Sequence, residues 1–207
     1  MPDDFELERL TVTGTFTRHS QPPIGESPVS DNFDLPAPKI KAPVNVWPTV
    51  AVCPFTIIID TREQLPYHFD SLGLFVPVSH RALVIGDYSI QGAENFIAIE
   101  RKSLADLYGS VTHGRDRFER EIQRLDAMCK FAAVSIEATW AEIADPESQD
   151  PAWDNQTRPE SVLGTIAAWS IRYPQVHWWP VGTRAGCELQ IFRTFKMWWK
   201  DHAPEGP

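Results

Sequence analysis

Residues 95–111 read Asn-Phe-Ile-Ala-Ile-Glu-Arg-Lys-Ser-Leu-Ala-Asp-Leu-Tyr-Gly-Ser-Val, and this stretch decides the fold because a strand in it passes directly into a helix. Residues 95–100 carry the isoleucines and the phenylalanine that are typical of a strand. Ser103 is a residue type that often caps helices. Apolar side chains then recur at spacings of 3, 4 and 7, at Leu104, Leu107, Tyr108 and Val111. The sequence therefore predicts a strand followed by a helix, with charged residues at the junction.

Two further strands are predicted before this stretch. Residues 82–90 form a strand that Gln91-Gly92-Ala93-Glu94 joins to residues 95–100 as a hairpin. Residues 55–60, Phe-Thr-Ile-Ile-Ile-Asp, are a nearly continuous β-branched run. Such a run is typical of a strand that is buried on both faces.

After residue 111, helices and strands alternate. We expect helices over about 116–130 and 184–200, a helix opened by a capping box of Thr157 and Glu160, strands at 131–137 and 176–181, and a loop over 145–159. Strands that alternate with helices predict an α/β fold of three layers, with a central mixed sheet flanked by helices.

Four acidic residues stand at the predicted strand ends and turns: Asp60, Glu63, Asp87 and Glu100. The arms of a hairpin lie about 5 Å apart, so the predicted hairpin can bring Asp87 close to Glu100. Alternation along the strand puts Glu100 and Lys102 on one face and Arg101 on the other. Two carboxylates and an ammonium group are thus predicted to converge.

Carboxylates and a lysine in this arrangement suit the metal-dependent hydrolysis of phosphodiesters. Magnesium prefers hard oxygen ligands and keeps several waters, so two or more carboxylates and a substrate phosphate form its usual site. The ion polarises the phosphoryl oxygen and lowers the pKa of a bound water. A neighbouring lysine orients that water or offsets charge on the scissile phosphate.

Three segments resemble the nuclease domain of the XPF-type family: residues 59–63 (Ile-Asp-Thr-Arg-Glu), 86–88 (Gly-Asp-Tyr) and 100–107 (Glu-Arg-Lys-Ser-Leu-Ala-Asp-Leu). The signature of that family is Gly-Asp, a variable spacer, Glu-Arg-Lys, three residues and Asp. This chain matches it at Gly86-Asp87, Glu100-Arg101-Lys102 and Asp106. Residues 109–111 and 114–115 also resemble the next helix of the family and its following turn. The likeness spans roughly residues 55–200.

The resemblance implies a restriction-endonuclease-like fold that cuts branched or flapped DNA with magnesium, or with manganese in its place. It implies that Asp87 and Glu100 are metal ligands, with help from the Arg101 carbonyl. Asp60, a third expected ligand, and Glu63 would complete the acidic wall.

The resemblance also implies supporting roles around these carboxylates. Lys102 would position the water or the phosphate. Arg62 and Arg101 would fix carboxylates or touch the DNA backbone. Asp106 would orient Lys102 or Arg101.

Each of these assignments has a plainer alternative. A Gly-Asp pair is common in bends, so Asp87 alone would indicate a turn; the Glu-Arg-Lys that follows favours a ligand. Glu63 could belong to the site or be an ordinary loop residue. Asp106 could form a structural ion pair with Lys102 or Arg101, or have a catalytic role. The arginines of the predicted 116–130 helix and the residue before it are open between a solvated face and DNA contact: Arg115, Arg117, Arg120 and Arg124.

Charge sets a limit on DNA binding. The chain has 19 Lys and Arg against 28 Asp and Glu, a net charge of −9, whereas a protein that grips DNA through its surface is usually basic. We therefore expect weak intrinsic affinity for DNA, or help from a partner. Three scattered cysteines (Cys53, Cys129, Cys187) fit neither a disulfide framework nor a zinc site, and buried thiols are the simpler reading.

The first 53 residues differ from the rest, with recurrent prolines and few periodic apolar positions. We expect an extended arm or linker at 1–53, a nuclease domain at 54–202 and a short tail at 203–207. The acidic start without an apolar segment, and apolar runs too short for a bilayer, predict a protein of the cytoplasm, bacterial or phage-infected, with no membrane contact.

The leading hypothesis is a magnesium-dependent DNA endonuclease that acts on branched DNA or on single-strand/double-strand junctions, in repair, recombination or replication, with a second copy of this chain as a dimerising partner. A scaffold or DNA-binding subunit that keeps the fold without catalysis is the alternative. A phosphohydrolase of RNA or small nucleotides is a weaker one, since nothing in the sequence recognises the ribose hydroxyl.

Overall fold

The computed structural model describes residues 52–148, 150 and 152–202, so the first 51 residues and the predicted tail lie outside it. Its sheet has six strands in the order β2-β1-β3-β4-β5-β6. The strands are β1 Ile57–Ile59, β2 Val78–His80, β3 Tyr88–Ile90, β4 Ile97–Lys102, β5 Phe131–Ile136 and β6 Val176–Pro180. β1 and β4 each pair antiparallel with β3, whereas β1–β2, β4–β5 and β5–β6 are parallel. The predicted mixed sheet is confirmed.

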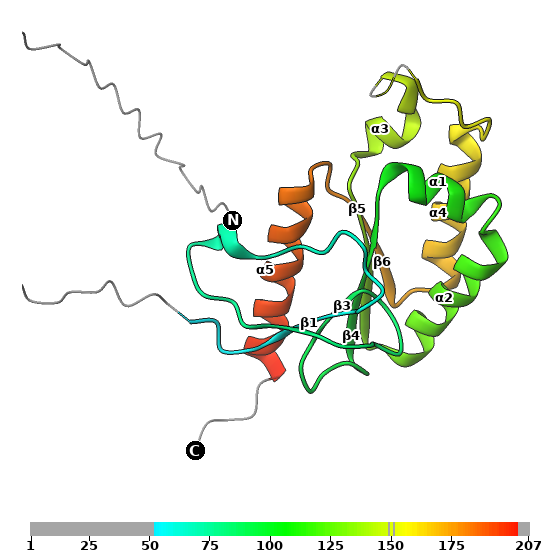
Figure 1. The fold of residues 1–207 in the computed structure, drawn as a ribbon. Helices are drawn as coiled ribbons and strands as arrows, with labels where there is room; N and C mark the ends of the chain where they lie inside the picture. The colour runs from blue at the N-terminus through cyan, green and yellow to red at the C-terminus, as the bar shows by residue number, and fades with distance from the viewer. Residues whose placement is uncertain (1–51, 149, 151, 203–207) are drawn as a thin grey trace, which may run out of the picture. The chain divides into compact units, whose positions relative to one another are not determined.

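Helices cover both faces of this sheet. They are α1 Leu104–Val111, α2 Arg115–Met128, α3 Trp140–Ala144, α4 Pro159–Arg172 and α5 Arg184–His202, with short 3-10 helices at Asp70–Leu72 and Pro146–Ser148. Figure 1 shows α1, α2 and α4 on one side of the strands and α5 on the other. The predicted three layers are therefore confirmed. Among the described residues, no helix has the length and apolar character that crossing a membrane requires.

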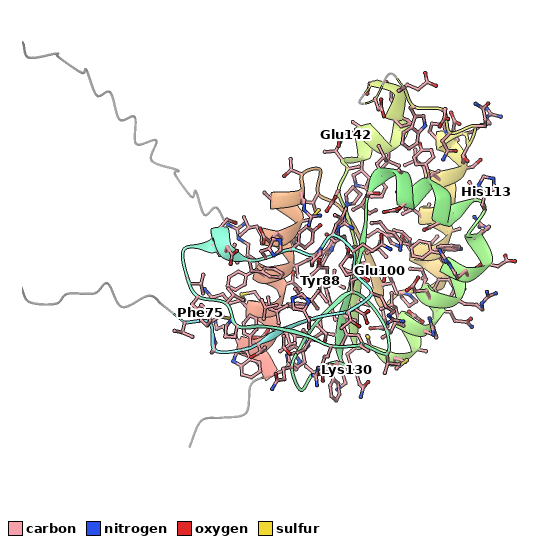
Figure 2. The ribbon with its side chains drawn as sticks, in the orientation of Figure 1. Phe75, Tyr88, Glu100, His113, Lys130 and Glu142 are labelled. Carbon is pink, nitrogen blue, oxygen red and sulfur yellow. The ribbon has the colours of Figure 1, made fainter. Side chains whose placement is uncertain are left out.

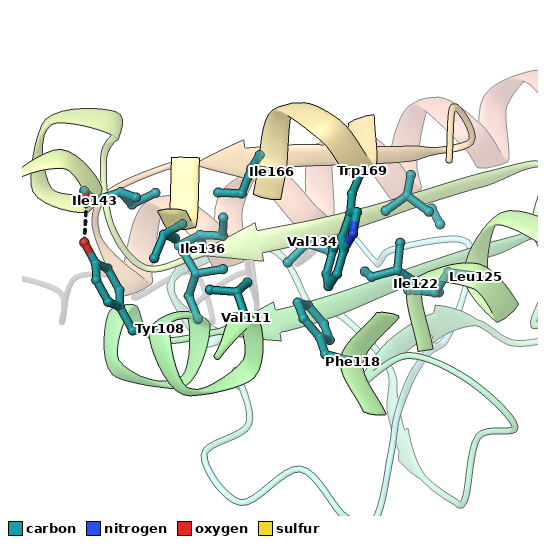
Figure 3. Close-up of a cluster of buried hydrophobic side chains, with 14 of the residues drawn as sticks. Tyr108, Val111, Phe118, Ile122, Leu125, Val134, Ile136, Ile143, Ile166 and Trp169 are labelled. Atoms are coloured by element: carbon teal, nitrogen blue, oxygen red, sulfur yellow. Dashed lines mark hydrogen bonds between the residues drawn. The ribbon is translucent and has the colours of Figure 1, made fainter. Parts of the chain in front are cut away.

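The core beneath α1, α2 and α4 fixes the rotation of α2. Phe118, Ile122 and Leu125 follow one another at helical spacing and are fully buried. Phe118 lies edge-on to Trp169 of α4, with ring centroids 5.7 Å apart (Figure 3). Burying each such side chain contributes roughly 1.5–3 kcal/mol. This packing turns the charged residues of α2 outward and toward the end of β4.

A second core lies under α5. Ile191 and Phe195 of α5 are buried in one cluster with Ile57, Ile59 and Tyr88 of the sheet. All three isoleucines of β1 are at most 1% exposed, so the strand predicted to be buried on both faces is confirmed. The three cysteines are buried and unpaired, as expected of structural thiols.

The hairpin forms, but its first arm is shorter than predicted. Only Tyr88–Ile90 is strand, and residues 81–87 are irregular. The backbone of Leu83 bonds the side chains of Asp60 and Arg62 in place of a strand partner, and Gly86 has a φ of 71°. A side chain at Gly86 would bring its Cβ to 3.1 Å from Ala98 Cβ and 3.2 Å from the Ile99 carbonyl oxygen. Glycine therefore allows the bend that precedes Asp87.

One local prediction is wrong, and two elements were not predicted. The capping box at Thr157 and Glu160 does not form, since α4 begins after Arg158 with a proline and has no side-chain cap. The strand β2 was not predicted, because its half-buried Val78–His80 lacks an apolar run. The helix α3 was not predicted either, and it begins with a capping box in which Thr139 and Glu142 bond each other's backbone.

Candidate active site

The end of β4 carries three charged residues that alternate between the faces of the sheet. Glu100 is 4% exposed, and its Oε1 accepts a hydrogen bond of 2.5 Å from Lys102 Nζ. Its other oxygen, Oε2, is buried and accepts no hydrogen bond. Figure 2 shows Glu100 in the interior between the strands and α2, whereas the exposed His113 lies at the turn before that helix. The end of β4 thus holds a buried carboxylate with one oxygen unpaired.

Asp87 meets Glu100 across the hairpin. The register pairs Tyr88 with Ile99, and the Asp87 N–H donates to the Ile99 carbonyl over 2.9 Å, so the next pair along is Asp87 and Glu100. Asp87 Oδ2 accepts the Arg101 N–H at 2.7 Å, and no bond is formed by Oδ1 within the described residues. The structure therefore brings the two carboxylates together, as the hairpin predicted.

The two carboxylates oppose each other's ionisation. Burial raises the pKa of Glu100, and the Asp87 carboxylate raises it further, against the effect of Lys102. Burial also raises the pKa of Asp87, and the negative charges of Glu63 and Glu121 raise it further. Burial lowers the pKa of Lys102, but Glu100 and the other acids outweigh it and keep the ammonium protonated. A buried and a half-buried acid with one cation form a site in which a further cation would be stabilised.

A cavity of about 370 Å³ opens over these residues. Its lining includes Glu63, Asp87, Glu100, Lys102 and Arg117, and almost all of it is charged or polar. Such a lining suits a hydrated, charged ligand better than an apolar one.

Arg101, on the other face of β4, belongs to a network that the sequence did not reveal. Its Nε donates to Glu137 Oε1 at 2.8 Å, and its Nη1 lies 3.4 Å from Glu63 Oε1. Glu137 Oε1 also accepts the Tyr67 hydroxyl at 2.7 Å and Arg184 Nη1 at 2.9 Å. Glu137 directly follows β5, the parallel neighbour of β4, and this position was the available signal. The network ties the Glu63 loop and the start of α5 to the site.

Asp60 does not line the cavity. It is 1% exposed, and each of its oxygens already accepts two hydrogen bonds: Oδ1 from the Arg62 N–H and Nε, and Oδ2 from Arg62 Nη2 and the Leu83 N–H. Arg62 Nη2 also donates to the Leu83 carbonyl at 2.8 Å. Asp60 and Arg62 therefore hold the loop of residues 81–87 that carries Asp87.

Asp106 has a local partner. Its carboxylate accepts the Ser103 hydroxyl at 2.7 Å, and its N–H donates to Ser103 Oγ at 3.1 Å, which caps α1. Within the described residues it makes no bond to Lys102 or Arg101, contrary to the expectation. It still lines the cavity beside Lys102.

The four predicted DNA-binding arginines divide into two groups. Arg115 points inward, where its Nη1 donates to Thr165 Oγ1 at 2.7 Å and its guanidinium lies 5.1 Å from the Trp169 ring centroid. The other three, Arg117, Arg120 and Arg124, are exposed and line a hollow of about 310 Å³ along α2. The helix therefore presents three arginines next to the acidic cavity.

Glu121 is a further acidic residue at the site, and it was not predicted from the sequence. It lies four residues after Arg117 and three before Arg124, and lines a second cavity of about 230 Å³ together with Arg62 and Asp87. Its spacing from the buried face of α2 was the only available signal.

The residues present fit a divalent cation. Glu100 and Asp87 each keep an oxygen without a donor, and hard oxygens are the ligands that magnesium and manganese prefer. Within residues 52–148, 150 and 152–202, no three His, Cys, Asp or Glu side chains gather into a compact metal-binding cluster. The carboxylate pair is thus the only basis for an ion here, with waters and phosphate as its remaining ligands.

The family model of the ERCC4 domain matches residues 59–186, which is more than half of the chain. Two solved structures are similar in fold: XPF from Aeropyrum pernix (20% identity, TM-score 0.54, covering 70% of this chain and 67% of that one) and the same protein in complex with DNA (21%, 0.53, 73% and 68%). No curated protein matches by sequence. The chain belongs to the ERCC4 domain family, and its α/β fold is that of the XPF nuclease domain.

Proposed function

We propose that this protein is a metal-dependent DNA endonuclease that hydrolyses phosphodiester bonds, with branched or flapped DNA as its substrate. One observation supports this most: the buried Glu100 and the half-buried Asp87 are paired across the hairpin, each with a carboxylate oxygen that accepts no hydrogen bond, next to the protonated Lys102. The family and the DNA complex of a structurally similar XPF support DNA as the substrate.

Each charged residue of the cavity has a separate role in the proposed reaction. Asp87 and Glu100 would hold a magnesium or manganese ion, which would polarise the scissile phosphate and lower the pKa of the attacking water. Lys102, held by Glu100 over 2.5 Å, places its positive charge where the phosphate gains negative charge. Arg101 orients Asp87 through its N–H and holds Glu63 in the wall of the cavity.

One predicted ligand and several predicted supporting residues receive other roles. Asp60 has no free oxygen, so we assign it the positioning of the 81–87 loop instead of a place on the ion. Arg62 shares that role, although its exposed side chain also lines the cavity. Asp106 is assigned to the capping of α1. DNA backbone contact falls to Arg117, Arg120 and Arg124, and Arg115 is assigned to the packing of α2 on α4.

The test is nicking of labelled DNA forks, flaps, duplex and single strands, and of an RNA fork, with magnesium, manganese or chelator. We expect cleavage of the branched DNA with either ion, none with chelator, and a loss of about 100-fold or more in Asp87→Asn and Lys102→Gln. Arg158→Gln is the control, because that side chain is 83% exposed and far from the site in sequence. DNA binding without turnover under all these conditions would overturn the proposal in favour of a non-catalytic subunit.

A further inference from the structure

Glu121 faces the site from the helix that covers it. Phe118, Ile122 and Leu125 turn the buried face of α2 toward the sheet. Glu121 stands at the edge of that face, half-buried, and shares a cavity of about 230 Å³ with Asp87. The carboxylate therefore reaches the site from the side opposite to β4.

The Glu121 carboxylate has no bonding partner, although three arginines line the adjoining cavities. Within the described residues it accepts no hydrogen bond and forms no ion pair. Two other acids of α2 have partners: Glu119 pairs with Arg172, and Asp126 accepts the Gln175 N–H at 2.9 Å, whereas Asp116 is exposed to solvent. A half-buried carboxylate that forms no ion pair with the nearby guanidinium groups would be stabilised by another cation in the cavity.

A second, independent observation points to that cation. Glu100 Oε2 is fully buried and accepts no hydrogen bond, although Lys102 pairs with the other oxygen of the same carboxylate. The charge of Glu121 acts on Asp87, Glu100 and Lys102 alike, so all of these groups lie within electrostatic reach of it. Asp87 lies beside Glu100 in one cavity and beside Glu121 in the next, so a divalent ion at Asp87 would offset the repulsion among the three carboxylates.

We propose that Glu121 is a third carboxylate of the divalent-ion site, and that it contacts waters carried by an ion that Asp87 and Glu100 ligate. The inference rests on the proposed function. No three acids of the described residues form a compact cluster, so we assign Glu121 to the waters of the ion and not to the ion itself. Magnesium keeps several waters in protein sites, so a carboxylate across the cavity has hydrogen bonds to accept. Loss of such an outer contact typically weakens metal affinity 10- to 100-fold.

The test is Mn²⁺ binding to the full chain without DNA, measured from the electron paramagnetic resonance signal of free Mn²⁺. We expect affinity about 10-fold weaker in Glu121→Gln and abolished in Asp87→Asn. Asp116→Asn is the matched control: it removes the same charge from an exposed position on α2. Circular dichroism of each variant checks that it is folded.

The salt concentration separates contact from a distant charge. At about 0.5 M KCl, long-range effects are screened, whereas a water-bridged contact persists. The inference predicts that the 10-fold difference remains at that salt. Equal Mn²⁺ affinity of Glu121→Gln and the parent chain, or a difference that disappears in salt, overturns it while the proposed function stands. A parent chain that binds no Mn²⁺ overturns both.

Discussion

At the scale of single residues, Glu137 connects more of the site than any other side chain described. Its carboxylate accepts hydrogen bonds from Arg101, Arg184 and Tyr67. Arg101 in turn donates to Asp87 through its backbone N–H and to Glu63 through its side chain. The geometry of the acidic pair therefore depends on a residue that does not itself line the cavity.

Glu137→Gln is expected to destabilise the protein at neutral pH by about 1–3 kcal/mol, because the buried Arg101 loses the nearer of its two charged partners. Burial raises the pKa of Glu137, but the hydrogen bonds from Arg101 and Tyr67 outweigh it, so the net shift is downward. A lowered pKa contributes stability above the unfolded value near 4.3, which is lost as the pH falls through the folded value.

Urea unfolding of the parent and Glu137→Gln, from neutral pH down to about pH 3, measures this effect. The difference in free energy of unfolding should shrink as the pH falls below about 4. A constant difference across that range would show that Glu137 acts through packing alone.

At the scale of elements, the bend before β3 sets the position of Asp87. Gly86→Ala places a side chain at a φ of 71° and against Ala98 and the Ile99 carbonyl. We expect a loss of about 1–3 kcal/mol in stability, together with reduced Mn²⁺ affinity. Gly109→Ala in α1 is the control, because a Cβ there meets no atom within 4 Å and alanine favours helix by about 1 kcal/mol. Equal stability of the two variants, measured by urea unfolding, would contradict this account of the bend.

The outer face of α2 is expected to bind the DNA backbone. Arg120→Gln and Arg124→Gln should weaken DNA binding for all sequences and lower the slope of log affinity against log salt by about 1 each. Arg115→Gln should leave that slope unchanged and instead lower thermal stability, because Arg115 bonds Thr165 and lies over Trp169. Fluorescence anisotropy over a salt series measures the slopes. A fall in slope for Arg115→Gln alone would reverse the assignment.

The sequence predicts those parts of the site that depend on residues close together in the chain. The alternation of residues 100–102 and the β-branched run of β1 depend on neighbours in the chain, and both formed as expected. The hairpin also formed, with a first arm shorter than predicted. Arg115 and Glu121 depend on the rotation of α2, which Phe118 and Trp169 set through contacts between distant segments. The place of Glu137 in the site depends on the parallel pairing of β4 with β5. The strand β2 forms only because it pairs with β1. A single sequence does not reveal such long-range contacts.

At the scale of the whole molecule, charge is distributed unevenly. The chain carries a net charge of −9, yet Arg62, Arg117 and Arg124 gather around the acidic cavities. In the proposed site, a divalent ion would add two positive charges at the point where a phosphate would bind. It would thereby offset part of the repulsion that an acidic protein exerts on DNA.

The central claim is that Asp87 and Glu100 share one divalent ion. Crystals soaked in Mn²⁺, with diffraction recorded at the manganese absorption edge, test it directly. The account predicts an anomalous density peak about 2.0–2.3 Å from an oxygen of each carboxylate. Mn²⁺ that lies elsewhere in the crystal, with Asp87 and Glu100 left without it, would contradict the account.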